Sequence, residues 1–548
     1  MALKRVYLIF IISIIVGCKK QEKKFTPISL QKSLITKNKD LTKKEKETWF
    51  LKDILLDTIP GLSIERLRDS FQFKNPDKRI IVAVLDTEVD INHSVIKNNV
   101  WLNPDEIPNN GIDDDKNGYI DDINGWNFLG AKNGENNTFT SYSYTRVVKK
   151  LAPKYKNLKD TDSIDSEEYN YYLAAKKRFE KMKKYAKEDI DYSNMLINSL
   201  NNVESHLAKY FPKKQFKIVS LDSLKKLYPN DKELQRSILI KSNFINYGFS
   251  RQYMNNYKLK AEAREVKMLN LDYDERALTE DDPEDINDII YGNKLVNNNT
   301  DFFYHGTEIS GSILSVNDKV DIMPVCITPV GNESDKDIAV GIKYAVNNGA
   351  NIINMSFGKR FSVNTQWVLD AMKYAEEHNV LIVSSAGNWN YDLNEVNNYF
   401  PNDNINNGKE YVNNFILVGG ITSKLNKEFR LVYSNYGNID VDAFAPAEDI
   451  YTTFPNNISR LDTGTSLAAS LTSGIASLIY QQYPNLKAAQ IKQILMDSGL
   501  EFKLEVSNPD IEKIEKTIPI NKLSKSGKVI NAYNALIMAD SISNLKKL

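Results

Sequence analysis

The sequence predicts an α/β fold in which a doubly wound, mostly parallel sheet carries an inserted α-helical subdomain. Three observations support this: short apolar runs rich in Ile and Val, helical patterns between those runs, and a long charged stretch in the first half of the chain. With 548 residues, of which 42% are hydrophobic and 26% charged, the chain can bury one large core or two.

Five continuous apolar runs, each ending in small or polar residues, predict buried parallel strands. They cover residues 79–86, 320–327, 351–357, 380–388 and 414–422. Helical patterns at 334–349 and 364–379 separate some of them, and each pattern ends at Gly or Asn. Ligands of such sheets bind at the carboxyl ends of the strands, so the polar residues there are the candidate functional residues.

The N-terminus has the layout of a secretory signal, with a basic start and a short apolar run over residues 1–17. The sequence Ile15-Val16-Gly17-Cys18 resembles the lipobox of bacterial lipoproteins, in which cleavage leaves the cysteine as the lipidated N-terminus. This resemblance implies an extracytoplasmic protein, periplasmic or at the cell surface, that is lipid-anchored to a bacterial membrane through Cys18. An ordinary signal peptide is the alternative. The Lys-rich residues 18–47 predict a tether.

The charge balance gives no reason to expect nucleic acid as a partner, because 71 Lys and Arg residues face 71 Asp and Glu residues. The second cysteine, Cys326, lies in an apolar stretch, so we expect a buried thiol and no disulfide framework. We expect one domain over 48–540, interrupted by a helical insertion at 140–275 and followed by a C-terminal tail at 541–548. We expect the protein to be a monomer.

Four polar residues occupy positions suited to a hydrolytic site. Asp86 and Asn388 each end an apolar run, while His305, one of four histidines, and Ser466 each precede a helix of small residues. A helix start can stabilise an oxyanion, although a serine there also commonly caps the helix. Each residue alone has an ordinary structural explanation. Because the four residues occur in this chain order and each is surrounded by small residues, we expect that their joint occurrence is not due to chance.

The segments "VAVLDT", "HGT", "SSAGN" and "GTSLAAS" in this order resemble the subtilisin-like serine proteases, the subtilases. The resemblance implies a serine endopeptidase that acts through an acyl-enzyme on protein or peptide substrates. Its triad would be Asp86, His305 and Ser466, with Asn388 in the oxyanion hole. The substrate would pair as an added strand with two segments. These are Ser356, Phe357 and Gly358, and Ser385, Ala386 and Gly387.

Four residues depart from the pattern of the family. They are Glu88 and Ala447, where glycine is usual, Glu308, where a second histidine is usual, and Ser470, where proline is usual. None of these changes removes a catalytic group. Glu88 nevertheless supports an alternative, a catalytically impaired binding module, and a calcium-stabilised adhesin is a more distant one. A zinc pair of His305 and Glu308 lacks a third ligand near it in sequence and an HExxH motif.

An acidic loop after the first predicted strand has the spacing of a calcium site. Its candidate ligands are Asp113, Asp115, Asn117, the Tyr119 carbonyl and Asp121, arranged around Gly118. The twelfth position holds Asn124 instead of the usual glutamate. We expect a structural Ca²⁺ ion here, and an acidic solvated turn is the alternative. A second acidic cluster at 280–288 is a weaker candidate.

The long separation between Asp86 and His305 implies the insertion. Apolar residues there step by three and four along two stretches, 172–186 and 196–207, which predicts a helical hairpin beside the cleft. The charged run 176–188 predicts an exposed face. The alternative is that the insertion has a function, as a lid over the cleft or as an exosite for the substrate.

Overall fold

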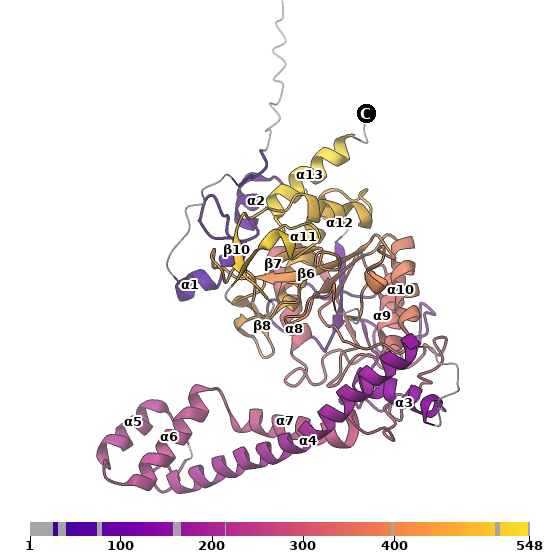
Figure 1. Ribbon diagram of the computed structural model, residues 1–548. Coiled ribbons are helices and arrows are strands. Elements are labelled where there is room, and N and C mark those ends of the chain that lie inside the picture. The colour runs from indigo at the N-terminus through magenta and orange to yellow at the C-terminus, as the bar shows by residue number, and fades with distance from the viewer. Residues whose placement is uncertain are drawn as a thin grey trace, which may run out of the picture.

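A central parallel sheet lies between two layers of helices, and a long helical arm extends from one side of this body (Figure 1). The computed structural model describes residues 26–30, 40–73, 79–156, 166–213, 215–395, 399–509 and 516–545. Cys18 and the signal-like segment 1–17 lie outside these ranges. Within them, the structure has no helix that is long and apolar enough to span a bilayer.

Seven strands of the described chain form the sheet in the order β2-β3-β1-β4-β5-β6-β7, with every neighbouring pair parallel. Their bounds are β1 Ile80–Asp86, β2 Trp126–Asn127, β3 Val320–Cys326, β4 Ile352–Met355, β5 Leu381–Ser385, β6 Phe415–Ile421 and β7 Ala443–Pro446. The five predicted strands and the α/β class are confirmed. The sequence did not reveal β2, which has two residues, or β7, which lies in a mixed segment and ends in proline.

The side chains of β1 alternate between the two faces of the sheet and divide the core into two clusters. Val82 and Val84 contribute to one cluster, with the helices α8 His305–Val316, α11 Thr465–Gln482, α12 Ala488–Asp497 and α13 Ala532–Leu545. Ala83 and Leu85 contribute to the other, with α9 Asp335–Asn347 and α10 Thr365–Glu377. Both predicted helices, α9 and α10, are therefore confirmed.

Shorter elements complete the body. They are α1 Lys43–Lys46, α2 Ile64–Ser70, the 3-10 turns Trp49–Leu51, Ile405–Asn407 and Ile520–Lys522, the hairpin of β8 Ile450–Phe454 with β9 Ile458–Asp462, and the pair β10 Glu505–Ser507 with β11 Thr517–Pro519. Helix α13 continues into the predicted C-terminal tail.

Parts of the predicted tether lie against the body. Ile28 is buried, and its backbone exchanges hydrogen bonds of 2.7 and 2.9 Å with the side chain of Asn534. Lys46 forms a 2.6 Å ion pair with Asp449, and Trp49 is fully buried. The described residues of the 18–47 segment are thus anchored to the domain that they precede.

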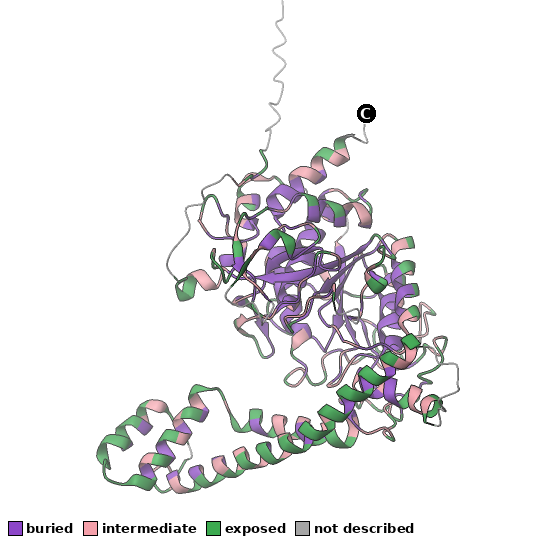
Figure 2. Ribbon diagram, in the orientation of Figure 1, coloured by how far each residue is buried: buried purple, intermediate pink, exposed green. Residues whose placement is uncertain are grey.

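The helical arm, residues 143–268, corrects the predicted hairpin. It consists of α3 Ser143–Tyr155, α4 Ser166–Leu207, α5 Ile218–Leu227, α6 Lys232–Asn246, α7 Arg251–Ala263 and a π-helical turn Arg264–Met268. The stretches 172–186 and 196–207 both belong to the single helix α4, because no Gly or Pro interrupts the residues between them. Helices α5, α6 and α7 return along it, and most of the arm is exposed or half-buried (Figure 2).

Candidate active site

Asp86 and His305 form a hydrogen-bonded pair at the carboxyl edge of the sheet. Asp86 is the last residue of β1 and is buried, and its Oδ1 atom lies 2.7 Å from Nδ1 of His305, the first residue of α8. The backbone N–H of Thr87 donates to the same oxygen at 2.7 Å, and that of Ile327 donates to the Asp86 carbonyl at 2.9 Å. The carboxylate is therefore fixed, and it orients the imidazole with Nε2 free of this pairing.

The charges around His305 favour its protonated form. Burial lowers the pKa of His305, but the charge and hydrogen bond of Asp86, followed by the charges of Glu308 and Asp462, raise it to about 9. Burial also raises the pKa of Glu308 to about 7, against the attraction of the His305 cation. The neutral imidazole, which predominates only above this pKa, is a strong proton acceptor, as a general base requires.

Ser466 stands in the first turn of α11, next to the end of β4. Its hydroxyl donates to the Ser356 carbonyl at 3.1 Å, and the Ser356 hydroxyl donates back to the Ser466 carbonyl at 3.1 Å. Among the described residues, no hydrogen bond joins Ser466 to His305, so the hydroxyl must turn from Ser356 to use that base.

The amide of Asn388 is fixed beside the start of α11. Its Oδ1 atom accepts hydrogen bonds from the backbone N–H of Thr465 at 3.0 Å and from the Thr465 hydroxyl at 3.1 Å. Among the described groups, none forms a hydrogen bond with its Nδ2, which remains able to donate. Asn388 is exposed, so this N–H group is accessible to an incoming oxyanion.

The two predicted substrate-binding segments lie side by side because they follow the paired parallel strands β4 and β5. Tyr399 packs between them and donates to the Ser385 carbonyl at 2.5 Å. A Cβ atom at Gly358 would lie 2.2 Å from the Tyr399 hydroxyl, and Gly387 has φ +94°, so both positions require glycine. Phe357 and Ala386 are buried and support this edge of the site.

The family departures are accommodated without loss of the Asp86–His305 pair. The buried Glu88 carboxylate accepts hydrogen bonds of 2.5 Å from the Asn136 side chain and the Asn299 backbone, and burial raises its pKa to about 7. Its backbone does not adopt a positive φ. The Ser470 hydroxyl donates to that of Ser312 on the neighbouring helix α8 at 2.8 Å, and α11 continues unbroken through Ser470. Ala447 is buried in the core.

The acidic loop brings together Glu106, Asp113 and Asp115, each of which offers one oxygen within 4.8 Å of the others. None of these three forms a salt bridge with a described residue, so their charges repel one another. Asp121 does not join them, since its carboxylate pairs with Lys294 at 2.9 Å and accepts from the backbone of Gly111 at 3.2 Å. Asp121, one of the predicted ligands, thus has its charge neutralised by a lysine and lies outside this acidic cluster.

The remaining predicted loop ligands hold the loop together. The Asn117 side chain donates to Asp115 at 3.0 Å and accepts from the Tyr119 backbone N–H at 2.7 Å. The Tyr119 ring is buried among aromatic side chains, with its centroid 5.1 Å from that of Trp126. Asn117 and the backbone of Tyr119 thus remain near the acidic cluster.

Sequence reasoning missed three residues of these sites. Glu106 precedes the regular loop spacing and Lys294 is distant in sequence, so neither had a local signal. Thr465 lies in the quoted segment "GTSLAAS", where its role in holding Asn388 was not evident. The buried, unpaired Cys326 matches its prediction.

Known proteins resemble parts of this chain. It is 27% identical to Subtilisin DY of Bacillus licheniformis over 211 residues, 37% of this chain and 72% of that protein. It is 29% identical to Alkaline elastase YaB of Bacillus sp. (strain YaB) over 205 residues, 36% of this chain and 50% of that protein. The crystal structure of a lanthipeptide protease aligns with TM-score 0.34 and 25% identity, covering 43% of this chain and 75% of its own.

The profile of the subtilase family matches residues 77–510, which is most of the chain. This range includes the three candidate triad residues and Asn388. The chain belongs to the subtilase family of serine endopeptidases.

Proposed function

We propose that this protein is a lipid-anchored, extracytoplasmic endopeptidase that cleaves peptide bonds with the triad Asp86, His305 and Ser466. The observation that carries the proposal is the 2.7 Å hydrogen bond between the buried Asp86 and His305, at the sheet edge where α11 presents Ser466. The catalytically impaired module is less well supported, because Glu88 leaves this pair intact.

In the proposed reaction, the Ser466 hydroxyl turns from the Ser356 carbonyl and gives its proton to Nε2 of His305 as its oxygen attacks the substrate carbonyl. Asp86 fixes the imidazole tautomer and stabilises the imidazolium. The Asn388 Nδ2–H and the Ser466 backbone N–H hold the oxyanion, and loss of one such donor costs about 3 kcal/mol of transition-state stabilisation. His305 then protonates the leaving amine, and water releases the acyl group by the reverse proton transfers.

We also propose that the acidic loop binds a structural Ca²⁺ ion through Glu106, Asp113 and Asp115, with Asn117 and the Tyr119 carbonyl as further oxygen donors. Their chemistry fits a hard cation, because carboxylate and carbonyl oxygens are its preferred ligands. The three unpaired carboxylates also need a positive charge nearby. The ion's role would be to hold the loop that follows β1.

The anchor proposal depends on the lipobox-like sequence before Cys18. Replacement of Cys18 by alanine should move the protein from the membrane fraction to the soluble fraction and stop incorporation of labelled palmitate. If Cys18→Ala stays in the membrane fraction, another element anchors the protein. Our working expectation remains a monomer that acts on proteins or peptides.

The triad proposal is tested with a fluorophosphonate probe, which labels only an activated serine. The wild-type protein should be labelled and Ser466→Ala should not, while Ser470→Ala, a buried serine on the same helix, is the matched control and should be labelled. Equal labelling of Ser466→Ala would refute the assignment, as would absence of labelling in a folded wild-type protein.

A further inference from the structure

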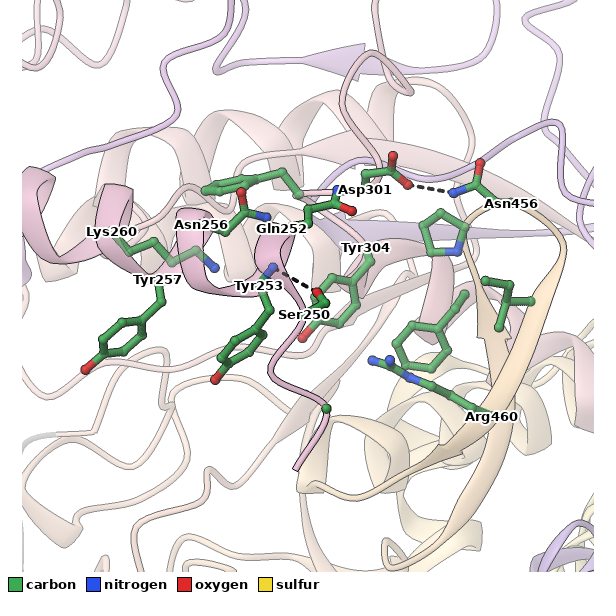
Figure 3. Close-up of a pocket in the computed structure, with 15 residues that line it drawn as sticks. Ser250, Gln252, Tyr253, Asn256, Tyr257, Lys260, Asp301, Tyr304, Asn456 and Arg460 are labelled. Carbon is green, nitrogen blue, oxygen red and sulfur yellow. Dashed lines mark hydrogen bonds between the residues drawn. The ribbon is translucent and has the colours of Figure 1, made fainter. Parts of the chain in front are cut away.

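A hollow of about 690 Å³ lies between the helical arm and the body (Figure 3). Helix α7 of the arm contributes Tyr253, Tyr257 and Lys260. The body contributes Tyr304, Phe454 and Arg460, from the start of α8 and from the β8–β9 hairpin. We call this hollow the arm groove. It exists only because the arm lies opposite the hairpin.

Two elements that line the groove lead directly to candidate triad residues. Tyr304, which lines it, immediately precedes His305, and β9, which carries Arg460, leads directly into the segment that ends at Ser466. The two predicted substrate-binding segments follow β4 and β5 instead, and we assign them to the acyl side of the scissile bond. Because His305 must protonate the leaving amine, the polypeptide on the leaving side of the scissile bond has to start beside His305. The arm groove is therefore placed to receive that part of the substrate.

The hairpin side of the groove is preformed. The Asn456 side chain donates to Asp301 at 2.6 Å, and its backbone N–H donates to Asp90 at 3.0 Å, which ties the hairpin turn to the body. The Arg460 guanidinium carbon lies 3.5 Å from the centre of the Phe454 ring, which restrains that cation. Because the hairpin is already fixed to the body, it can position a ligand without a loss of conformational entropy on binding.

The lining of the groove favours anions. Lys260 lies over the Phe302 ring at 4.7 Å, so its ammonium group is restrained on the arm side. Arg460 supplies a second cation on the opposite side, where it also forms a 3.8 Å ion pair with Asp462 at the end of β9. The one acidic residue of the lining, Asp301, already accepts a hydrogen bond from Asn456. Two cations among tyrosine rings therefore face the space.

We propose that the arm groove binds the leaving side of the substrate polypeptide and selects an acidic side chain there through Lys260 and Arg460. This inference rests on the proposed peptidase function. It makes α7 a specificity element of the protease.

Internally quenched peptides test the selection. They share one acyl side and differ only in a single Glu, Gln or Lys at successive leaving-side positions. At one leaving-side position, kcat/KM for the Glu peptide should exceed that for the Gln peptide about tenfold. This preference should decrease when salt is added. Lys260→Gln should lower this preference about threefold, and Arg460→Gln likewise. Lys258→Gln, on the same helix but outside the lining, is the matched control and should keep the preference.

A binding measurement separates this inference from catalysis. Ser466→Ala protein should bind a fluorescent Glu peptide more tightly than the matching Gln peptide, as measured by anisotropy, and Lys260→Gln in that background should reduce the difference about threefold. Equal affinities for the two peptides would overturn the groove proposal even if the wild-type enzyme is active. A Glu preference in an enzyme that the fluorophosphonate does not label would leave the groove proposal supported and refute the triad.

Discussion

The body and the helical arm are stabilised in different ways. In the body, α11 buries 16 of its 18 residues, and the strands from β4 to β7 are buried throughout. In the arm, α4 buries only eight of its 42 residues. The arm depends on small apolar clusters and on ion pairs such as Arg264 with Asp189. Chemistry that needs fixed geometry therefore lies in the body, and the arm can change with less effect on the triad.

The largest expected effect is in the body, at the Asp86–His305 pair. Asp86→Asn should reduce kcat on a small ester substrate about 10⁴-fold, because the amide can stabilise the wrong imidazole tautomer and not the imidazolium. The melting temperature should change little, which calorimetry can check. An active Asp86→Asn enzyme would mean that the body does not hold a triad.

The next effect concerns the packing of the body. Ile475→Ala removes a fully buried side chain from α11 and should lower the free energy of unfolding by about 3 to 4 kcal/mol. Denaturant titration measures this loss. Because α11 carries Ser466, thermal inactivation of esterase activity should shift together with the unfolding transition.

The matched change in the arm is Leu221→Ala, which removes a fully buried side chain from its outer apolar cluster. It should destabilise the arm locally by about 2 to 4 kcal/mol and leave ester hydrolysis close to wild type. Hydrogen exchange should increase in α4, α5 and α6 and not in the sheet. Equal increases in both regions would show that arm and body unfold as one unit.

Calcium gives a smaller effect, confined to the loop after β1. At a calcium concentration a hundredfold above Kd, the ion would add about 2.7 kcal/mol of stability, so chelation should lower the melting temperature. Asp115→Ala should reproduce the loss and make the protein insensitive to the chelator. Asp121→Asn should remain sensitive, because that carboxylate pairs with Lys294. Identical melting of the wild type with EDTA and with calcium would rule the site out.

The smallest expected effect is a shift of the pH profile. His305 acts as a base only when neutral, and nearby negative charge raises its pKa, so kcat/KM should rise with pH through that pKa. Glu308→Gln removes one of these charges and should move the acid limb to lower pH by less than about one unit. Above the pKa of His305 the two enzymes should be equally active. A shift to higher pH would contradict this electrostatic role.

Much of the body was predictable because its signals are local. The five apolar strand runs and the helices α9 and α10 follow from the sequence pattern, and the sequence motifs predict the four candidate residues Asp86, His305, Asn388 and Ser466. For each of them, the pattern of a few consecutive residues is enough to make the prediction. The arm was predicted less well, because periodicity shows that a helix forms but not where it folds back.

The sequence by itself determined the fold class, the family and the candidate catalytic residues, because apolar runs and motifs consist of residues that are adjacent in the chain. Only the tertiary structure decided which charges meet. Glu106 lies with Asp113 and Asp115, Lys294 neutralises Asp121, and Lys260 of α7 lines the same hollow as Arg460 of the hairpin. Lys294 and Asp121 are far apart along the chain, and so are Lys260 and Arg460. Electrostatic interactions depend on distance in space, so they become defined only once the sheet and the arm have packed.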